Sequence, residues 1–89
     1  MEGYVSNLKI TVVGLGYVGL VTAVCLSEKG HHLTCIDINS RIINLLINRR
    51  VPIYEPGLEK LIEKNYTNLS FTTKYEEAII NSRVMSTTV

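Results

Sequence analysis

Three glycines near the start of the chain have the spacing of a phosphate-binding turn. Gly14, Gly16 and Gly19 form a G-x-G-x-x-G pattern between a β-branched apolar run and a run with helical periodicity. In such a turn the first glycine bends the chain, the second lets the backbone approach a pyrophosphate, and the third lets helix and strand pack closely. Backbone N–H groups at the start of the helix then face the phosphates. The cofactor-binding residues predicted here are Gly14, Leu15, Gly16, Tyr17, Val18 and Gly19.

An acidic residue stands where this pattern requires one. Asp37 lies about 20 residues after the last glycine, at the end of a second apolar run. A carboxylate there accepts hydrogen bonds from both adenosine ribose hydroxyls and repels a 2′-phosphate, so Asp37 predicts NAD and not NADP as the cofactor. The alternative is that Asp37 only opens the turn before the next helix. Arg41, the last predicted binding residue, can stack on adenine, accommodate a 2′-phosphate or be a plain surface residue.

Strands that alternate with helices are expected to position these residues. Apolar β-branched runs predict strands, and runs with i, i+3, i+4 periodicity predict helices. The expected strands are 8–13, 31–37, 68–72 and 83–89, and the expected helices are 17–29, one capped by Ser40, 57–64 and 74–80. This alternation predicts an α/β fold with a parallel sheet, the first half of a Rossmann-type doubly wound sheet, truncated after that half. The alternative explanation for the three glycines is a strand, a tight turn and a helix that bind no ligand.

Length and composition bound what the chain can be. It has 89 residues, a net charge of +1 and 46% hydrophobic residues, which indicates a folded globular segment without a nucleic-acid partner. At this length we expect one small domain, with residues 1–89 forming a partial amino-terminal NAD-binding domain. No signal pattern and no apolar run near the ~20 residues of a membrane span are present, which predicts a cytoplasmic protein without a membrane partner.

The other reactive residue types are expected to be structural. Cys25 and Cys35 lie in apolar segments without metal-ligand spacing, which predicts reduced thiols in the core. His31 and His32 precede a strand, whereas ligands of open α/β sheets bind at the carboxyl ends, so a solvated turn is expected. The side chain of Tyr17 is expected to pack. No arrangement suited to catalysis or metal binding is evident, so the segment is expected to bind and not to react.

Three longer runs resemble a known family. They are VVGLGYVGLVTAVCLSEKGHHLTCIDIN, PIYEPGLEKLI and LSFTTKYEEAI. Together they cover most of the chain and closely resemble the amino-terminal part of the UDP-glucose/GDP-mannose dehydrogenase family, its UDP-glucose 6-dehydrogenases most of all. The resemblance implies an oxidoreductase that oxidises the C6 alcohol of UDP-glucose twice, consumes two NAD and yields UDP-glucuronate. It also implies a homo-oligomer.

The resemblance assigns roles to several of these residues. Segment 14–19 matches the pyrophosphate-binding turn of the family, and Asp37 matches its ribose-binding acid. Arg41 matches a basic residue near the adenosine, with one residue fewer after Asp37 than the family has. Residues 54–56 lie in the matching PIYEPGL segment, for which we expect only a rigid loop framed by prolines.

The last residues depart from the family pattern. The family's fourth strand is apolar and leads to Gly-Thr-Pro, whereas this chain has Arg83 and the hydroxyl residues Ser86, Thr87 and Thr88. Hydroxyl groups left unpaired in a buried strand cost about 1 to 3 kcal/mol each. The resemblance places the catalytic cysteine, the helix that joins protomers and the UDP-binding domain after these residues. The chain alone is therefore expected to be inactive, the product of a gene shortened or frameshifted near Ser82.

Other functions remain open from the residues alone. A stand-alone module can bind a nucleotide, or pair the edge of its fourth strand with another chain. A nonfunctional fragment, or a related dehydrogenase that acts on GDP-mannose or UDP-N-acetyl sugars, would carry the same residues. NAD binding that is lost on Asp37→Ala would favour a binding function over a nonfunctional fragment.

Overall fold

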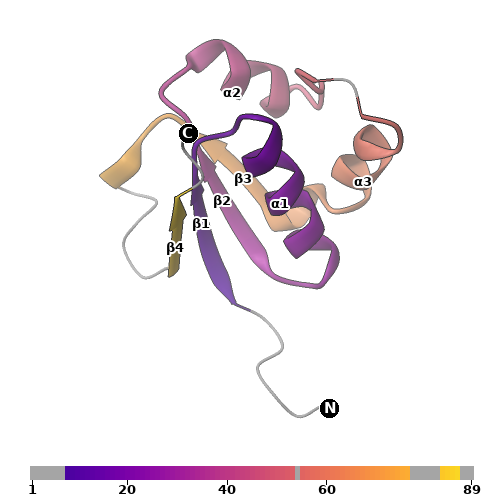
Figure 1. Ribbon diagram of the computed structural model, residues 1–89, viewed down its shortest axis with the longest axis horizontal. Helices are drawn as coiled ribbons and strands as arrows, with labels where there is room; N and C mark the ends of the chain where they lie inside the picture. Colours follow the sequence, from indigo (N-terminus) through magenta and orange to yellow (C-terminus); the bar gives the residue numbers. More distant parts are fainter. Residues whose placement is uncertain (1–7, 54, 77–82, 87–89) are drawn as a thin grey trace.

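A four-stranded parallel sheet forms the centre of the fold (Figure 1). The structure, a computed structural model, describes residues 8–53, 55–76 and 83–86. The strands are β1 Lys9–Val13, β2 His32–Ile36, β3 Leu69–Thr72 and β4 Arg83–Ser86. Their order is β3-β2-β1-β4, so β1 has β2 on one side and β4 on the other. The carboxyl end of β1 is therefore the point where the strand order reverses, which is where open α/β sheets bind ligands.

Helices connect the first three strands. α1 Tyr17–Glu28 joins β1 to β2, and the connection from β2 to β3 contains α2 Ser40–Ile47, α3 Leu58–Lys64 and the 3₁₀ turn η1 Tyr66–Asn68. Figure 1 shows α1 lying over the strands, with α2 above it and α3 beside it. The predicted alternation is confirmed for these elements, although η1 is an addition. The predicted helix 74–80 and the end of the predicted strand 83–89 lie mostly outside the described residues. Within the described ranges, no helix has the length and apolar character needed to cross a membrane.

The start of α2 differs from the expectation by one residue. Asn39, and not Ser40, is the N-cap. Its Oδ1 accepts hydrogen bonds from the N–H groups of Arg41 at 3.0 Å and Ile42 at 3.3 Å. Asn39 has an extended backbone (φ −80°, ψ 101°) that aims its side chain at the first turn, while Ser40 is already helical. Asparagine and serine cap about equally well, so residue type alone does not decide between them.

Two rows of apolar side chains cross the sheet beneath the helices. The first row is Ile10, Leu33 and Leu69, and the second is Val12, Cys35 and Phe71. The helices complete the core with Leu20, Ala23, Val24, Ile43, Leu46, Leu58 and Ile62. The side chain of Leu15, which is 2% exposed, belongs to the same core. Burial of this side chain therefore anchors the glycine turn to the rest of the fold.

The two cysteines differ in exposure. Cys35 in β2 is buried, as predicted, and burial raises its pKa to about 12. Cys25 in α1 is exposed, so the prediction of a core thiol is wrong at this position. It directly follows Val24, which is fully buried, and one step along a helix rotates the side chain by about 100°. The apolar neighbours of Cys25 indicate a helix but do not reveal which face carries the thiol.

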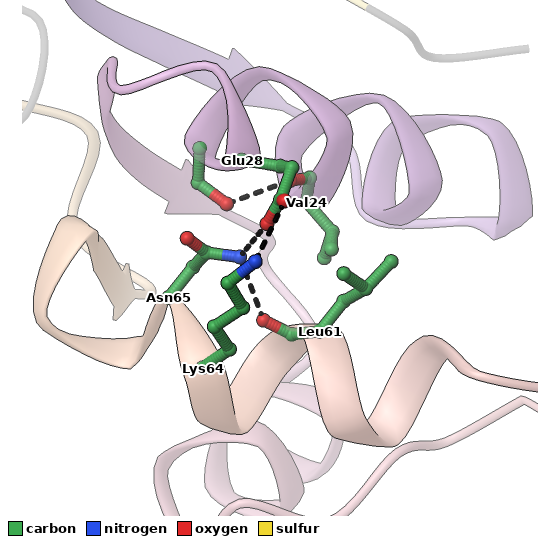
Figure 2. Close-up of polar contacts among 6 residues, drawn as sticks. Val24, Glu28, Leu61, Lys64 and Asn65 are labelled. Carbon is green, nitrogen blue, oxygen red and sulfur yellow. Dashed lines mark hydrogen bonds and ion pairs between the residues drawn. The ribbon is translucent and has the colours of Figure 1, made fainter.

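Polar contacts join the end of α1 to the end of α3 (Figure 2). Glu28 Oε2 accepts a hydrogen bond from Lys64 Nζ at 2.9 Å, and Glu28 Oε1 accepts one from Asn65 Nδ2 at 2.7 Å. Asn65 Nδ2 also donates to the carbonyl oxygen of Leu61 at 3.0 Å. The hydrogen bond from Asn65, followed by that from Lys64, holds the pKa of Glu28 below its ordinary value. These contacts fix α3 beside α1 at the end remote from the glycine turn.

Candidate cofactor-binding site

The carboxyl ends of three strands are tied together beside the glycine turn. β1 ends at Val13, and the N–H of Gly14 donates to the carbonyl oxygen of Ile36 at the end of β2 (2.8 Å). The N–H of Asp37 in turn donates to the carbonyl oxygen of Thr72 at the end of β3 (3.3 Å). Gly14 has a φ of +94°, a left-handed conformation that strains any side chain. The first glycine of the pattern is therefore needed for the bend out of β1.

The Asp37 carboxylate holds the glycine turn in place. Its Oδ2 accepts a hydrogen bond from the N–H of Leu15 at 2.8 Å, and its Oδ1 accepts one from the N–H of Asn39 at 2.9 Å. The bond to Asn39 is the turn-opening role expected as an alternative, and Asp37 makes it while also facing the glycine turn. Charge-assisted bonds of this kind are roughly twice as strong as neutral ones. Motif spacing predicts that Asp37 lies near the turn but not that it bonds to the turn's backbone.

The start of α1 leaves room for an anion. Gly16 is the N-cap residue, and no side chain of the described residues caps the helix there. The exposed residues Tyr17 and Val18, followed by Gly19, form a first turn without an acidic residue. Their N–H groups have no carbonyl partner within the helix. A Cβ at Gly16 would meet no atom within 4 Å. The positive end of the helix dipole therefore faces open space beside Gly16.

These features fit a dinucleotide. Gly16 gives access to the backbone, the first turn supplies N–H donors for a pyrophosphate, and Asp37 supplies a carboxylate for ribose hydroxyls. Gly19 is buried in α1, where the missing side chain allows close packing against the sheet. Arg41 is exposed in the first turn of α2, and its backbone N–H bonds to the cap residue Asn39. The glycine turn and Asp37 are thus in direct contact, and Arg41 is an exposed residue of the helix that follows Asp37.

The prediction that the Tyr17 side chain packs in the fold is wrong. Tyr17 is 52% exposed, and its hydroxyl donates a hydrogen bond to Glu55 Oε1 at 2.7 Å. This bond, followed by the charge of the carboxylate, raises the pKa of Tyr17. Tyr17 precedes the buried stripe of α1, which begins at Gly19 and Leu20, so its ring lies outside the core. The sequence alone did not indicate that Glu55 contacts Tyr17. Glu55 also lines an open hollow of about 550 Å³, together with Val51, Pro52, Ile53, Pro56, Gly57 and Glu59.

The histidines lie at the amino edge of the sheet, as predicted. His31 is half-buried, and its Nδ1 accepts a hydrogen bond from the N–H of Leu8 at 3.1 Å, while the exposed His32 begins β2. His31 therefore fastens the chain just before β1. In the part of the chain that the structure describes, no three His, Cys, Asp or Glu side chains gather into a possible metal site.

The sheet order, the glycine turn and the acid together define the class of protein. The order β3-β2-β1-β4, with a glycine turn after β1 and a carboxylate after β2, is that of dinucleotide-binding Rossmann domains. Residues 8–89 match the sequence model of the UDP-glucose/GDP-mannose dehydrogenase family, NAD binding domain. The chain therefore belongs to this family. The family resemblance, the fold class and NAD as the cofactor are confirmed.

Known relatives agree with this assignment. UDP-glucose 6-dehydrogenase YwqF of Bacillus subtilis (strain 168) is 49% identical over 80 residues, which are 88% of this chain and 18% of YwqF. GDP-mannose 6-dehydrogenase of Pseudomonas syringae pv. syringae is 47% identical over 74 residues, which are 81% of this chain and 17% of that protein. The solved UDP-glucose dehydrogenase of Pyrobaculum islandicum superposes with a TM-score of 0.86 at 34% identity, over 97% of this chain and 21% of that one. The chain thus spans about a fifth of the length of these relatives.

Proposed function

We propose that the residues at the carboxyl edge of the sheet hold NAD by its adenosine diphosphate half. The N–H groups of the glycine turn bind the pyrophosphate, Asp37 accepts hydrogen bonds from the ribose hydroxyls, and Arg41 lies along the adenine. The proposed binding residues are Gly14, Leu15, Gly16, Tyr17, Val18, Gly19, Asp37 and Arg41. The 2.8 Å bond between Asp37 Oδ2 and the Leu15 N–H carries the proposal, because one adenosine diphosphate has to touch both groups.

The carboxylate of Asp37 retains capacity for the ribose. Each carboxylate oxygen accepts two hydrogen bonds, and Leu15 and Asn39 use one on each oxygen. Ribose hydroxyls can therefore add to the bonds that hold the turn without displacing them. A 2′-phosphate at the same place would repel the carboxylate by about 1 kcal/mol per pair of unit charges 4 Å apart in water, and by more where solvent is excluded. This repulsion supports NAD over NADP.

Calorimetric titration of the chain with NAD and NADP tests the proposed site. We expect tighter binding of NAD than of NADP, and a loss of about 10-fold or more in NAD affinity on Asp37→Ala. Arg41→Ala is expected to weaken NAD binding by a smaller factor. Arg50→Ala is the matched control, because Arg50 is also an exposed arginine and lies beyond the other end of α2. Wild-type NAD affinity in Asp37→Ala would overturn the proposed site.

For the protein to which this domain belongs, we propose the oxidation of UDP-glucose to UDP-glucuronate with two molecules of NAD. Bound NAD supplies a hydride acceptor for the sugar alcohol. Residues 1–89 contribute the first part of the NAD-binding domain, and the whole protein is a homo-oligomer in this proposal. The described cysteines do not provide a nucleophile at the site, because Cys35 is buried with a raised pKa and Cys25 lies on the outer face of α1. The 49% identity with UDP-glucose 6-dehydrogenase YwqF supports this substrate.

GDP-mannose is the second candidate, because the GDP-mannose 6-dehydrogenase of Pseudomonas syringae is 47% identical over the matched segment. NADH absorbance in mixtures of the chain, NAD and either sugar tests whether the chain alone oxidises UDP-glucose or GDP-mannose. We expect no NADH from this chain alone with either sugar. A chimera in which the chain replaces the matching segment of YwqF is expected to form NADH from UDP-glucose. If the chain forms NADH from GDP-mannose but not from UDP-glucose, UDP-glucose is overturned as the substrate.

A further inference from the structure

A polar contact also joins α1 to the approach of α3 at the end nearest the glycine turn. The Tyr17 hydroxyl, in the first residue of α1 and directly after Gly16, donates to Glu55 Oε1 at 2.7 Å. Glu55 belongs to the proline-framed segment 51–57 that leads into α3. At the opposite end, the contacts of Glu28 in Figure 2 join the same two helices. The two helices therefore run in the same direction, with polar contacts at both ends.

Glu55 is presented from a fixed support. Its carbonyl oxygen accepts a hydrogen bond from the N–H of Leu58 at 3.0 Å. Gly57, with a φ of +85°, makes the left-handed turn that starts α3, and Leu58 is 4% exposed in the core. A shift of the Glu55 backbone would disturb this turn or withdraw Leu58 from the core. The Glu55 carboxylate therefore offers a stationary acceptor to a side chain that is itself half exposed.

The hydrogen bond selects one position for the Tyr17 ring. An exposed tyrosine otherwise samples several staggered rotamers. Tyr17 adjoins Gly16, whose open side is the approach to the first-turn N–H groups. A rotamer turned toward Gly16 would cover these donors with an aromatic ring, and binding a phosphate would then require the ring to be ordered elsewhere. A ring already held by Glu55 avoids this cost.

We propose that Glu55 is a positioning residue for the cofactor: through the hydroxyl of Tyr17 it keeps the aromatic ring off the pyrophosphate site beside Gly16. The inference rests on the proposed binding of pyrophosphate by the glycine turn. It gives Glu55 a role in NAD affinity although Glu55 lies outside the glycine turn. The raised pKa of Tyr17 agrees with the same hydrogen bond.

Single-residue variants test the contact by calorimetry with NAD. Tyr17→Phe removes only the hydroxyl and Glu55→Ala removes the acceptor, and each is expected to weaken NAD binding about 3- to 10-fold. The double variant is expected to lose no more than the weaker-binding single variant, because both changes break one bond. Glu55→Gln keeps an acceptor of the same length and is expected to bind NAD within about 2-fold of wild type. Tyr66→Phe is the matched control, because it loses a hydroxyl bond of 2.7 Å, to Ile47, near the amino edge of the sheet.

Two further measurements separate positioning from a structural role. Urea unfolding is expected to show similar stability losses for Tyr17→Phe and Tyr66→Phe, while only Tyr17→Phe loses NAD affinity. Spectroscopic titration of the tyrosines, which needs no cofactor, is expected to show a late-titrating group that Tyr17→Phe removes and Glu55→Ala shifts back. If Asp37→Ala abolishes NAD binding but Tyr17→Phe and Glu55→Ala bind like wild type, the positioning role is overturned and the proposed site stands. If the wild-type chain does not bind NAD, or if Asp37→Ala binds it normally, the proposed site falls and the positioning role falls with it.

Discussion

Asp37→Asn separates ribose recognition from the support that Asp37 gives to the glycine turn. The substitution removes the charge and converts one carboxylate oxygen into an amide NH₂. In the wild type both oxygens accept backbone N–H groups, from Leu15 at 2.8 Å and from Asn39 at 2.9 Å. The amide has a single acceptor oxygen, so one of these N–H groups faces a donor. The turn is therefore weakened before the cofactor binds.

The expected magnitudes follow from these bonds. Loss of a hydrogen bond to a charged group costs about 1.5 to 3 kcal/mol, and because Asp37 is only half-buried we expect the lower end for the free energy of unfolding. NAD loses a bond of the same kind, and about 1.4 kcal/mol corresponds to a 10-fold weaker Kd. NADP loses less, because the repulsion of its 2′-phosphate disappears with the charge. The preference for NAD over NADP is therefore expected to fall about 10-fold or more.

Calorimetry gives both dissociation constants, and urea unfolding followed by circular dichroism gives the stability of this tryptophan-free chain. Asn39→Ala is the matched control. It removes the cap of α2 at a cost of about 1 kcal/mol but keeps the carboxylate of Asp37, so it lowers stability without changing the ratio of NAD to NADP affinity. An unchanged ratio in Asp37→Asn, or an equal loss of NAD affinity in both variants, would refute the reasoning, since stability alone would then explain the result.

Further predictions concern the glycine turn, the thiols and acid stability. Gly16→Ala is expected to keep the free energy of unfolding within about 1 kcal/mol of wild type, because the added Cβ meets open space. The same Cβ is expected to obstruct the pyrophosphate and to weaken NAD binding about 10-fold or more. Urea unfolding checks the stability, and calorimetry checks the affinity. Gly14→Ala, at a φ of +94°, is expected to cost about 1 to 2 kcal/mol of stability, and wild-type urea unfolding would contradict the need for a left-handed residue there. Thiol labelling of the folded chain is expected to modify the exposed Cys25 and to spare Cys35, because burial raises the pKa of Cys35 to about 12. Equal labelling rates would contradict the described exposure. The pKa of Glu28 is lowered in the folded chain, so its contribution to stability is present above its unfolded pKa and is lost as the pH falls through the folded value. Urea midpoints are therefore expected to drop on acidification in the wild type and to drop less in Glu28→Gln.

Local chemistry explains what could be predicted from the sequence. Gly14 and Gly16 act on their own backbone and Asp37 ends an apolar run, so the strand, turn, helix and acid follow from neighbouring residues. The contact of Tyr17 with Glu55 joins residues 38 positions apart, and no periodicity links their two segments. The exposure of Cys25 could not be predicted from the sequence either, because α1 carries apolar residues on its outer face as well as on its inner face. The contact depends on how the residues before α3 lie against α1, and the exposure of Cys25 depends on which face of α1 packs into the core.

The central place of β1 in the sheet has a consequence for the order of events during synthesis. Ile10 is the register partner of both Leu33 in β2 and Arg83 in β4. The β1–β2 ladder can form once the chain through α1 and β2 has been made, whereas the β1–β4 ladder needs a segment that is made much later. Ribosomes add about 5–20 residues per second, so several seconds separate the emergence of β2 from that of β4. During that interval one side of β1 presents unpaired N–H and C=O groups, and a nascent chain in this state is open to chaperones and to mispairing with other strands.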